Sequence, residues 1–182
     1  VEKLGEQSMY RITGHRASAS YSIEKLMWIR AHEPDIFRAT RKALCAKDYL
    51  NFRLTGRFCS EHNDASGTNA YDISAHRWSP EILAAAEIGA DRLPEVLDST
   101  SVVGEVSRAA AEMTGLAAGT PVIAGAGDGG CATVGVGSVS EGVTYGYLGS
   151  SSWIYTTSRT PMYDPSLRTF TWCHPVPGFF QP

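Results

Sequence analysis

Residues 120–137 constrain the fold of this chain more than any other part of the sequence. They begin with a short apolar run, TPVIAGAG, which is typical of a buried strand. Asp128 follows among closely spaced glycines, and small residues then continue to Gly137. Because small residues let a helix pack closely against a sheet, the segment predicts a strand, a turn and a helix, as in α/β folds.

Helical signals dominate the sequence before this segment, and strand signals dominate the sequence after it. Residues 61–68 are small and polar, so they predict a loop. The change from helices to strands predicts a boundary near residues 137–141. The predicted elements are helices at 23–32, 34–42, 47–54, 80–89 and 108–113, the last capped by Ser107, and strands at 102–106, 120–127, 143–148 and 153–157.

Composition and charge exclude several classes of function. A formal net charge of -3, with no cluster of Lys and Arg, leaves no basic surface for nucleic acid. Apolar runs are far shorter than the ~20 residues of a membrane span, so no membrane partner is expected. The four cysteines lack metal or disulfide spacing, which predicts reduced thiols and a cytoplasmic protein. The chain starts at Val1 and stops after a strand-like segment, so both ends are expected to be cuts in a longer protein.

Asp128 is open to three interpretations. The glycines leave space for a ligand and a helix start stabilises an anion, so its carboxylate could accept the proton of an alcohol attacking a phosphoryl group. Spacing alone favours an ordinary helix cap. The run GAGDGG also matches the GxGxxG pattern of dinucleotide-binding folds, but the next predicted strand ends at Leu148 and Gly149 without the acidic residue that would bind a ribose.

A second candidate site is the serine-rich turn between the two last predicted strands. Its glycine and three hydroxyl groups could present donors to phosphate, or the turn could be an ordinary hairpin. The GxSxG motif of hydrolases would need glycine where Trp153 stands, and Walker A and protein-kinase motifs are absent from the sequence. The five histidines show no paired spacing, so no metal site is predicted. The residues of the turn are Gly149, Ser150, Ser151 and Ser152.

Seven segments that occur in order through most of the chain carry a family resemblance. They are TGHRASASYSIEKLMWIRAHEPDIF, AKDYLNFRLTGRF, NDASGTNAYDISAHRWSPEIL, LPEV, GTPVIAGAGDGGCATVGVG, LGSSSW and CHPVPG. With them the chain resembles the FGGY carbohydrate kinases, and the xylulose kinases most closely. The resemblance implies an α/β, actin-like or ribonuclease-H-like ATPase fold, in which two lobes enclose an active site.

The resemblance also assigns roles to individual residues. Asp128 matches the catalytic base in the family's GGGD block, and residues 149–152 match its second phosphate loop, usually GTS, which binds ATP. Tyr21 aligns with a position that faces the sugar, so Tyr21, Asp128 and Gly129 are the implied substrate-binding residues. Relatives commonly have Asn or Gln after the catalytic aspartate, whereas this chain has Gly129.

Domain organisation and partners follow from the same resemblance. Residues 1–138 correspond to the rear part of the N-terminal, sugar-binding lobe, and residues 139–182 to the beginning of the C-terminal, nucleotide-binding lobe. ATP and Mg²⁺ are the implied cofactors, and a sugar or polyol is the implied substrate. A homodimer is a further expectation, because a helix-rich part separated from its sheet partners would expose apolar surface.

The activity implied by the resemblance is ATP-dependent phosphorylation of a sugar or polyol hydroxyl, most closely D-xylulose to D-xylulose 5-phosphate in carbohydrate metabolism. Two alternatives stay open. One keeps the chemistry with ribulose, gluconate or glycerol as the substrate, which a screen of sugars would distinguish. The other is a non-catalytic actin-like binding module, which loss of ATP binding in the full-length protein would favour.

The chain by itself is expected not to turn over substrate. The family's first phosphate motif, DxGT, and its later adenosine-binding region are absent from the sequence, so half of the nucleotide site is missing. Incubation of the chain with ATP and D-xylulose should therefore release no ADP above background in a coupled assay. Turnover comparable with that of a full-length kinase would contradict this expectation.

Overall fold

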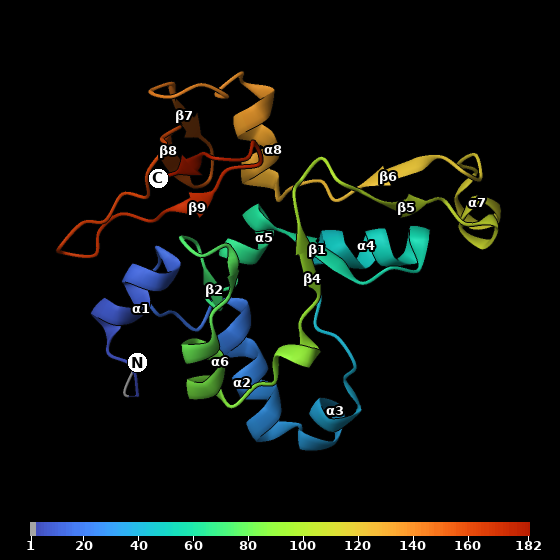
Figure 1. Ribbon diagram of the computed structural model, residues 1–182, viewed down its shortest axis with the longest axis horizontal. Coiled ribbons are helices and arrows are strands. Elements are labelled where there is room, and N and C mark those ends of the chain that lie inside the picture. The colour runs from blue at the N-terminus through green and yellow to red at the C-terminus, as the bar shows by residue number, and fades with distance from the viewer. Residues whose placement is uncertain (1–2) are drawn as a thin grey trace.

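The computed structural model describes residues 3–182. Helices and short strands alternate along the chain, and none of the helices in this range is long and apolar enough to cross a membrane (Figure 1). The helices are α1 (Glu6–Thr13), α2 (Ser22–His32), α3 (Pro34–Ala39), α4 (Ala46–Thr55), α5 (His62–Ser66), α6 (Pro80–Ala86), the 3₁₀ helix η1 (Ala90–Arg92), α7 (Arg108–Thr114) and α8 (Asp128–Gly135). The strands are β1 (Cys59–Glu61), β2 (Tyr71–Asp72), β3 (Arg77–Trp78), β4 (Glu95–Leu97), β5 (Val102–Glu105), β6 (Pro121–Ile123), β7 (Thr144–Leu148), β8 (Ser152–Thr156), β9 (Trp172–Cys173) and β10 (Phe180–Gln181).

The described strands form five separate pairs. β1 runs parallel to β4, and Cys59 lies opposite Glu95. The other pairs, β2–β3, β5–β6, β7–β8 and β9–β10, are antiparallel. In Figure 1, β5, β6 and α7 extend to one side, while β7, β8, β9 and α8 gather around the C-terminus. The chain therefore places the end of β6 and the start of α8 between these two regions.

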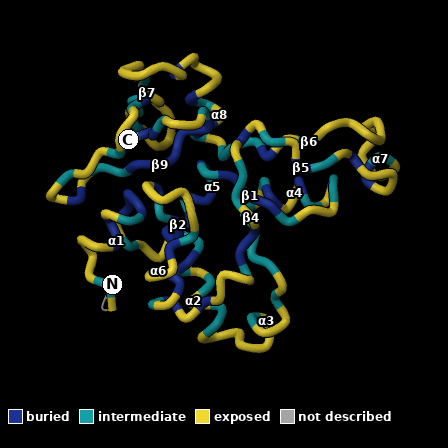
Figure 2. Tube along the Cα trace, in the orientation of Figure 1, coloured by how far each residue is buried: buried dark blue, intermediate teal, exposed yellow. Residues whose placement is uncertain are grey.

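Buried apolar side chains form clusters that join distant segments. The first cluster packs α1, α2 and α6 together. The second joins α5 to β2 and to the C-terminal strands β9 and β10, and these strands are among the most buried parts of the chain (Figure 2). This second cluster fixes the C-terminal strands against α5. Its members are Ala65, Tyr71, Ile73, Cys173 and Phe180, with Trp78 and Val96 at its edge.

Several predicted helices are confirmed, together with the signals that delimit them. α2 ends at His32, directly before the Glu33–Pro34 step. α4 is closed by Gly56, whose φ of 80° lies in the left-handed region that favours glycine. Ser107 caps α7, because its Oγ accepts a hydrogen bond from the backbone N–H of Ala110 at 3.1 Å. The predicted hairpin is present as β7 and β8.

Three predictions of local structure are corrected. The prediction of a loop at residues 61–68 is wrong, because β1 and α5 occupy 59–66. A buried glutamate explains this, since the carboxylate of Glu61 accepts hydrogen bonds from the N–H groups of Asn63 and Asp64 and caps α5. The helix predicted to reach Lys42 ends at Ala39, and the strand predicted at 120–127 spans only 121–123.

Removal of the Ser107 cap should weaken the protein measurably. Ser107→Ala leaves an N–H at the start of α7 without its partner, so the free energy of unfolding should fall by about 1 kcal/mol in chemical denaturation. Ser140 is exposed and serves as the control, because Ser140→Ala should change this free energy by less than about 0.5 kcal/mol. Equal effects of the two substitutions would contradict the capping role.

Candidate active site

Asp128 is the first residue of α8 and is exposed. The chain leaves β6 and passes through Gly125, whose positive φ of 78° turns it toward the helix. The carboxylate of Asp128 accepts a hydrogen bond from the N–H of Gly129 through Oδ1 at 2.8 Å. A negative charge at a helix N-terminus is stabilised by the helix dipole, so this position suits an ionised carboxylate.

Asn63 of α5 fixes the start of α8. Its Oδ1 accepts a hydrogen bond from Gly127 N–H at 3.2 Å, and its Nδ2 donates to the carbonyl oxygen of Cys173 at 2.7 Å. The side chain is buried, with 5% of its surface exposed, so water competes little for these bonds. α5, α8 and β9 are therefore held in one arrangement around Asp128.

Two glycines allow this close approach. A Cβ atom at Gly127 would lie 2.6 Å from Oδ1 of Asp64, a separation that real Cβ atoms do not show. A Cβ atom at Gly130 would overlap Oδ1 of Asn63 in the same way. The glycines that the sequence places around Asp128 are thus needed for the packing of α8 against α5.

A cavity of about 170 Å³ lies in front of Asp128. The carboxylates of Asp64 and Asp128 lie on its wall with the rings of Tyr155 and Trp172, so charged groups and aromatic faces line the same space. This composition suits a small polar molecule with C–H surfaces, because hydroxyl groups can pair with carboxylates while C–H groups pack on rings. The other lining residues are Asn63, Gly67, Gly127, Gly129, Gly130 and Gln181.

Lys47 lies behind Asp64 and connects the cavity to buried carboxylates. Its Nζ is 2.6 Å from Oδ1 of Asp48, 3.6 Å from Oδ2 of Asp64 and 3.9 Å from Oε1 of Glu61. Burial raises the pKa of the Asp64 carboxyl group, Lys47 opposes the rise, and the carboxylates of Asp48 and Asp128 add to it. Asp64 therefore holds its proton more tightly than an ordinary aspartate does.

One group of possible metal ligands occurs among the described residues. The donor atoms of Cys45, Asp48 and Asp64 lie within 4.8 Å of one another. Lys47 donates a hydrogen bond to Asp48 and already brings a positive charge to this group. No metal site was predicted here from the sequence, and the lysine supplies the charge that a cation would otherwise provide.

The predicted site residues differ in their placement. Asp128 and Gly129 line the same cavity. Tyr21 lines a neighbouring opening with Arg16 and Phe170, and its hydroxyl group is hydrogen bonded to Nδ1 of His15. The ring of His15 in turn lies 4.4 Å from that of Trp172, so Tyr21 is connected to the cavity through two aromatic side chains.

The turn at residues 149–152 lies away from the cavity. All four of its residues are exposed at the tip of the β7–β8 hairpin, and none of them lines the space in front of Asp128. The hairpin reaches the cavity instead through Tyr155, three residues after the turn. The predicted ATP-binding role of the turn stays a prediction.

Six residues that line the cavity were not predicted from the sequence, and one of them is Gly67, in the segment that was predicted as a loop. Asn63 and Asp64 lie in the segment that was predicted as a loop, where the capping residue Glu61 was the available signal. Tyr155, Trp172 and Gln181 come from three strands, two of which have only two residues. Such short strands carry no periodic pattern, so Trp172 and Gln181 had no signal in the sequence, whereas the strand that carries Tyr155 was predicted without any sign that this residue lines the cavity.

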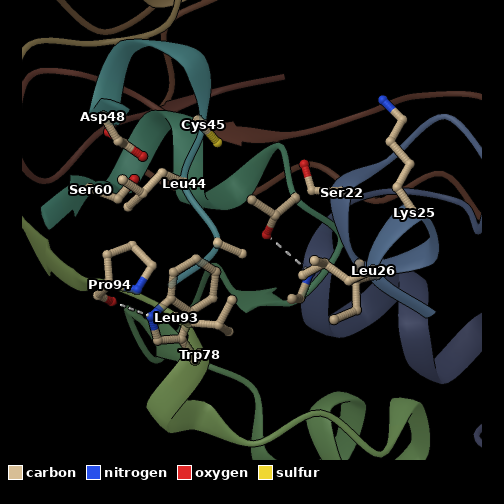
Figure 3. Close-up of a pocket in the computed structure, with 14 residues that line it drawn as sticks. Ser22, Lys25, Leu26, Leu44, Cys45, Asp48, Ser60, Trp78, Leu93 and Pro94 are labelled. Atoms are coloured by element: carbon tan, nitrogen blue, oxygen red, sulfur yellow. Dashed lines mark hydrogen bonds between the residues drawn. The ribbon is translucent and has the colours of Figure 1, made fainter. Parts of the chain in front are cut away.

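A different cavity, of about 210 Å³, lies between α2, α4 and β3 and has mostly apolar walls (Figure 3). Leu26, Trp78 and Leu93 form part of the apolar wall, and Cys45, Asp48 and Ser60 lie toward the other end. Within the described residues, Oδ2 of Asp48 and Oγ of Ser60 are buried without a hydrogen-bond partner. None of the predicted site residues lines this cavity.

Burial of Glu61 should make stability depend on pH. Burial raises the pKa of this carboxyl group from 4.5 to about 6 in the folded protein, so its ionisation costs about 2 kcal/mol of unfolding free energy. The stability that the folded protein has with a protonated Glu61 is fully present below pH 4.5 and is lost as the pH rises through about 6. Glu61→Gln cannot ionise and should therefore gain stability relative to the unmodified protein from pH 4.5 to neutral pH.

Urea denaturation at a series of pH values measures this difference. Glu105→Gln is the control, because it removes a carboxyl group from an exposed position, without the burial that Glu61 has. A difference for Glu61→Gln that does not change with pH would contradict the effect of burial.

Comparisons with known proteins identify relatives of this chain. Residues 1–135 match the N-terminal domain of the FGGY family of carbohydrate kinases. Xylulose kinase of Escherichia coli strain K12 is 34% identical over 166 residues, which cover 91% of this chain and 34% of that protein. An autoinducer-2 kinase of Escherichia coli is 33% identical over 177 residues, covering 97% of this chain and 33% of that protein. The chain thus spans about a third of the length of these relatives.

The fold is also shared with a solved structure. The crystal structure of xylulose kinase from Rhodospirillum rubrum superimposes with a TM-score of 0.92 at 29% sequence identity, covering 100% of this chain and 37% of that one. The predicted α/β fold of the actin-like, ribonuclease-H-like ATPase type is confirmed by this likeness and by the family match.

Proposed function

Because the chain belongs to the FGGY family of carbohydrate kinases, we propose that it forms part of an enzyme that transfers the γ-phosphoryl group of ATP to a hydroxyl group of a sugar or polyol. The observation that carries this proposal is Asp128, an exposed carboxylate at the start of α8 that faces a cavity with polar and aromatic walls. The kinases that this chain resembles are about three times as long. The proposed activity is therefore that of an enzyme of their length, of which this chain forms a part.

Asp128 acts as the general base in this proposal. The substrate hydroxyl lies in the cavity, and the carboxylate takes its proton as the oxygen attacks the γ-phosphorus atom. Asn63 and the glycines at 127 and 130 hold the carboxylate in place before the substrate arrives, so little reorganisation is needed during the reaction. Closure of two lobes over the cavity would exclude water and limit the hydrolysis of ATP.

ATP and Mg²⁺ belong to the same proposal. Residues 149–152, Gly149, Ser150, Ser151 and Ser152, would bind phosphate through N–H and O–H donors once the hairpin faces the cavity. The carboxylate of Asp64 lines the same cavity and offers the oxygen ligands that Mg²⁺ prefers, so Asp64 would help to hold the ion and would leave Asp128 free to accept the proton. A bound Mg²⁺ would supply positive charge next to the transferred phosphoryl group.

D-xylulose is the substrate that we propose, with D-xylulose 5-phosphate as the product. The support is similarity to xylulose kinases over most of this chain. An autoinducer-2 kinase is nearly as similar, so that substrate joins ribulose, gluconate and glycerol as the alternatives. A non-catalytic binding module is disfavoured by the intact carboxylate at position 128.

The division of the chain and the setting of the enzyme are also proposals. Residues 1–138 would belong to the sugar-binding lobe and residues 139–182 to the nucleotide-binding lobe. We propose a cytoplasmic enzyme, since the four cysteines are free. A homodimer is compatible with the exposed apolar side chains on α2, α3 and α7, such as Trp28, Ile36 and Met113.

Substitution of Asp128 tests the catalytic role. The full-length enzyme is first screened with D-xylulose, ribulose, gluconate, glycerol and autoinducer-2, and the substrate with the highest kcat/KM is kept. Asp128→Asn should then lower kcat by about 10²–10⁴-fold, because the amide cannot accept the proton. ADP release measures the rate, and circular dichroism confirms the fold.

Asp35→Asn is the matched control for this experiment. Asp35 is an exposed aspartate in the first turn of α3, far from the cavity, so kcat should not change. A folded Asp128→Asn enzyme with near wild-type kcat would remove Asp128 from the mechanism. A wild-type enzyme that neither binds ATP nor phosphorylates any of the five compounds would instead favour the non-catalytic module.

A further inference from the structure

Tyr155 of β8 lies across the cavity from Asp128 and has no role in the chemistry described so far. Its hydroxyl oxygen is 3.7 Å from the position that a Cβ atom of Gly129 would occupy. Gly129, which follows Asp128 in the sequence, has no side chain. Tyr155 therefore borders the space directly beside the catalytic carboxylate. A hydroxyl donor thus faces the cavity one residue away from the proposed base.

Neighbouring aromatic rings fix the position of Tyr155. Its ring meets that of Trp172 edge to face at a centroid distance of 5.6 Å, and it lies 5.8 Å from the ring of Tyr145. Tyr145 is in turn hydrogen bonded to Oγ1 of Thr133, which donates to the carbonyl oxygen of Gly129. The hairpin is therefore attached to α8 at the same residue over which the Tyr155 hydroxyl lies.

Gln181 of β10 also lies beside Gly129. Its Nε2 is 3.9 Å from the position of a Gly129 Cβ atom, and the residue lines the cavity. Only 1% of its surface is exposed, and Oε1 is buried without a hydrogen-bond partner among the described residues. A buried acceptor without a partner destabilises a protein, so a ligand hydroxyl that donates to it would be stabilised at this point.

We propose that Tyr155 and Gln181 form a second hydroxyl-binding subsite for the sugar, separate from the hydroxyl that Asp128 activates. Tyr155 donates a hydrogen bond to a non-reacting hydroxyl of the substrate, and that hydroxyl donates to the Gln181 carboxamide. The face of Trp172 packs against the C–H groups between the two hydroxyls. This subsite rests on the proposed kinase function and selects polyols with a second hydroxyl at the right distance from the first.

The ionisation state of Tyr155 is consistent with donation. Burial raises its pKa to about 12, and the neighbouring Tyr145 and Asp128 contribute to the rise. Tyr155 therefore keeps its proton at neutral pH and can donate a hydrogen bond there.

Kinetic measurements on the full-length enzyme test the subsite. Tyr155→Phe and Gln181→Leu should each raise KM for the sugar by about 3- to 10-fold, which corresponds to one neutral hydrogen bond. kcat and KM for ATP should stay within about 2-fold, because the contact is the same in the ground state and the transition state. The double variant should show no more than the larger single effect, because both residues bind one hydroxyl.

Deoxy analogues of the substrate identify the hydroxyl. Each non-reacting hydroxyl is removed in turn, and KM is compared between the wild-type enzyme and Tyr155→Phe. For one analogue, the one that lacks the bound hydroxyl, the two enzymes should have the same KM. A purely structural role of Tyr155 would instead give the same difference for every analogue.

Tyr49→Phe and Gln7→Leu are the matched controls, because both residues are exposed and distant from the cavity. An active wild-type enzyme whose KM for the sugar is unchanged in both site variants would overturn the subsite while leaving the kinase function intact. So would a parallel fall in kcat, ATP affinity and melting temperature, since this indicates lost packing. A wild-type enzyme without any kinase activity would refute the proposed function, and the subsite with it.

Discussion

The two hydrogen bonds of the Asn63 side chain hold together segments that are 64 and 110 residues apart in the sequence. One bond fixes the backbone just before α8, and the other fixes β9. The groups that line the cavity in front of Asp128 come from α5 and the glycine that follows it, from the start of α8, and from β8, β9 and β10. Without this amide, the N–H of Gly127 and the carbonyl oxygen of Cys173 would be left without their partner, and α8 would lose its attachment to α5.

Much of the fold could be predicted from the sequence where local signals act alone. α2 and α7 follow from apolar spacing, a proline boundary and a serine cap, and the glycine at 56 marks the end of α4. α5 was missed because glutamate is an uncommon helix cap, and the groups that hold its carboxylate in place, Ser99 and Lys47, come from distant segments. That environment is produced by the tertiary structure, and a single sequence does not contain it.

The candidate site was predictable in the same uneven way. Asp128 is marked by its glycines, because Gly125 has a positive φ and Gly127 and Gly130 approach other groups too closely for a side chain. The opposite wall has no such signal, since Tyr155, Trp172 and Gln181 meet only when β8, β9 and β10 pack together. The proposed base is thus encoded locally, whereas the groups of the proposed subsite are brought together by the topology.

The packing of Gly130 has a consequence for how this chain can vary over evolutionary time. The sequence of α8 consists mostly of small residues, but the two ends of the helix differ in the space available for a larger side chain. A methyl group on Gly130 would collide with Asn63, whereas one on Gly135 would meet nothing within 4 Å. Inherited changes should therefore be eliminated at position 130 and tolerated at position 135, although both positions hold glycine in the same helix.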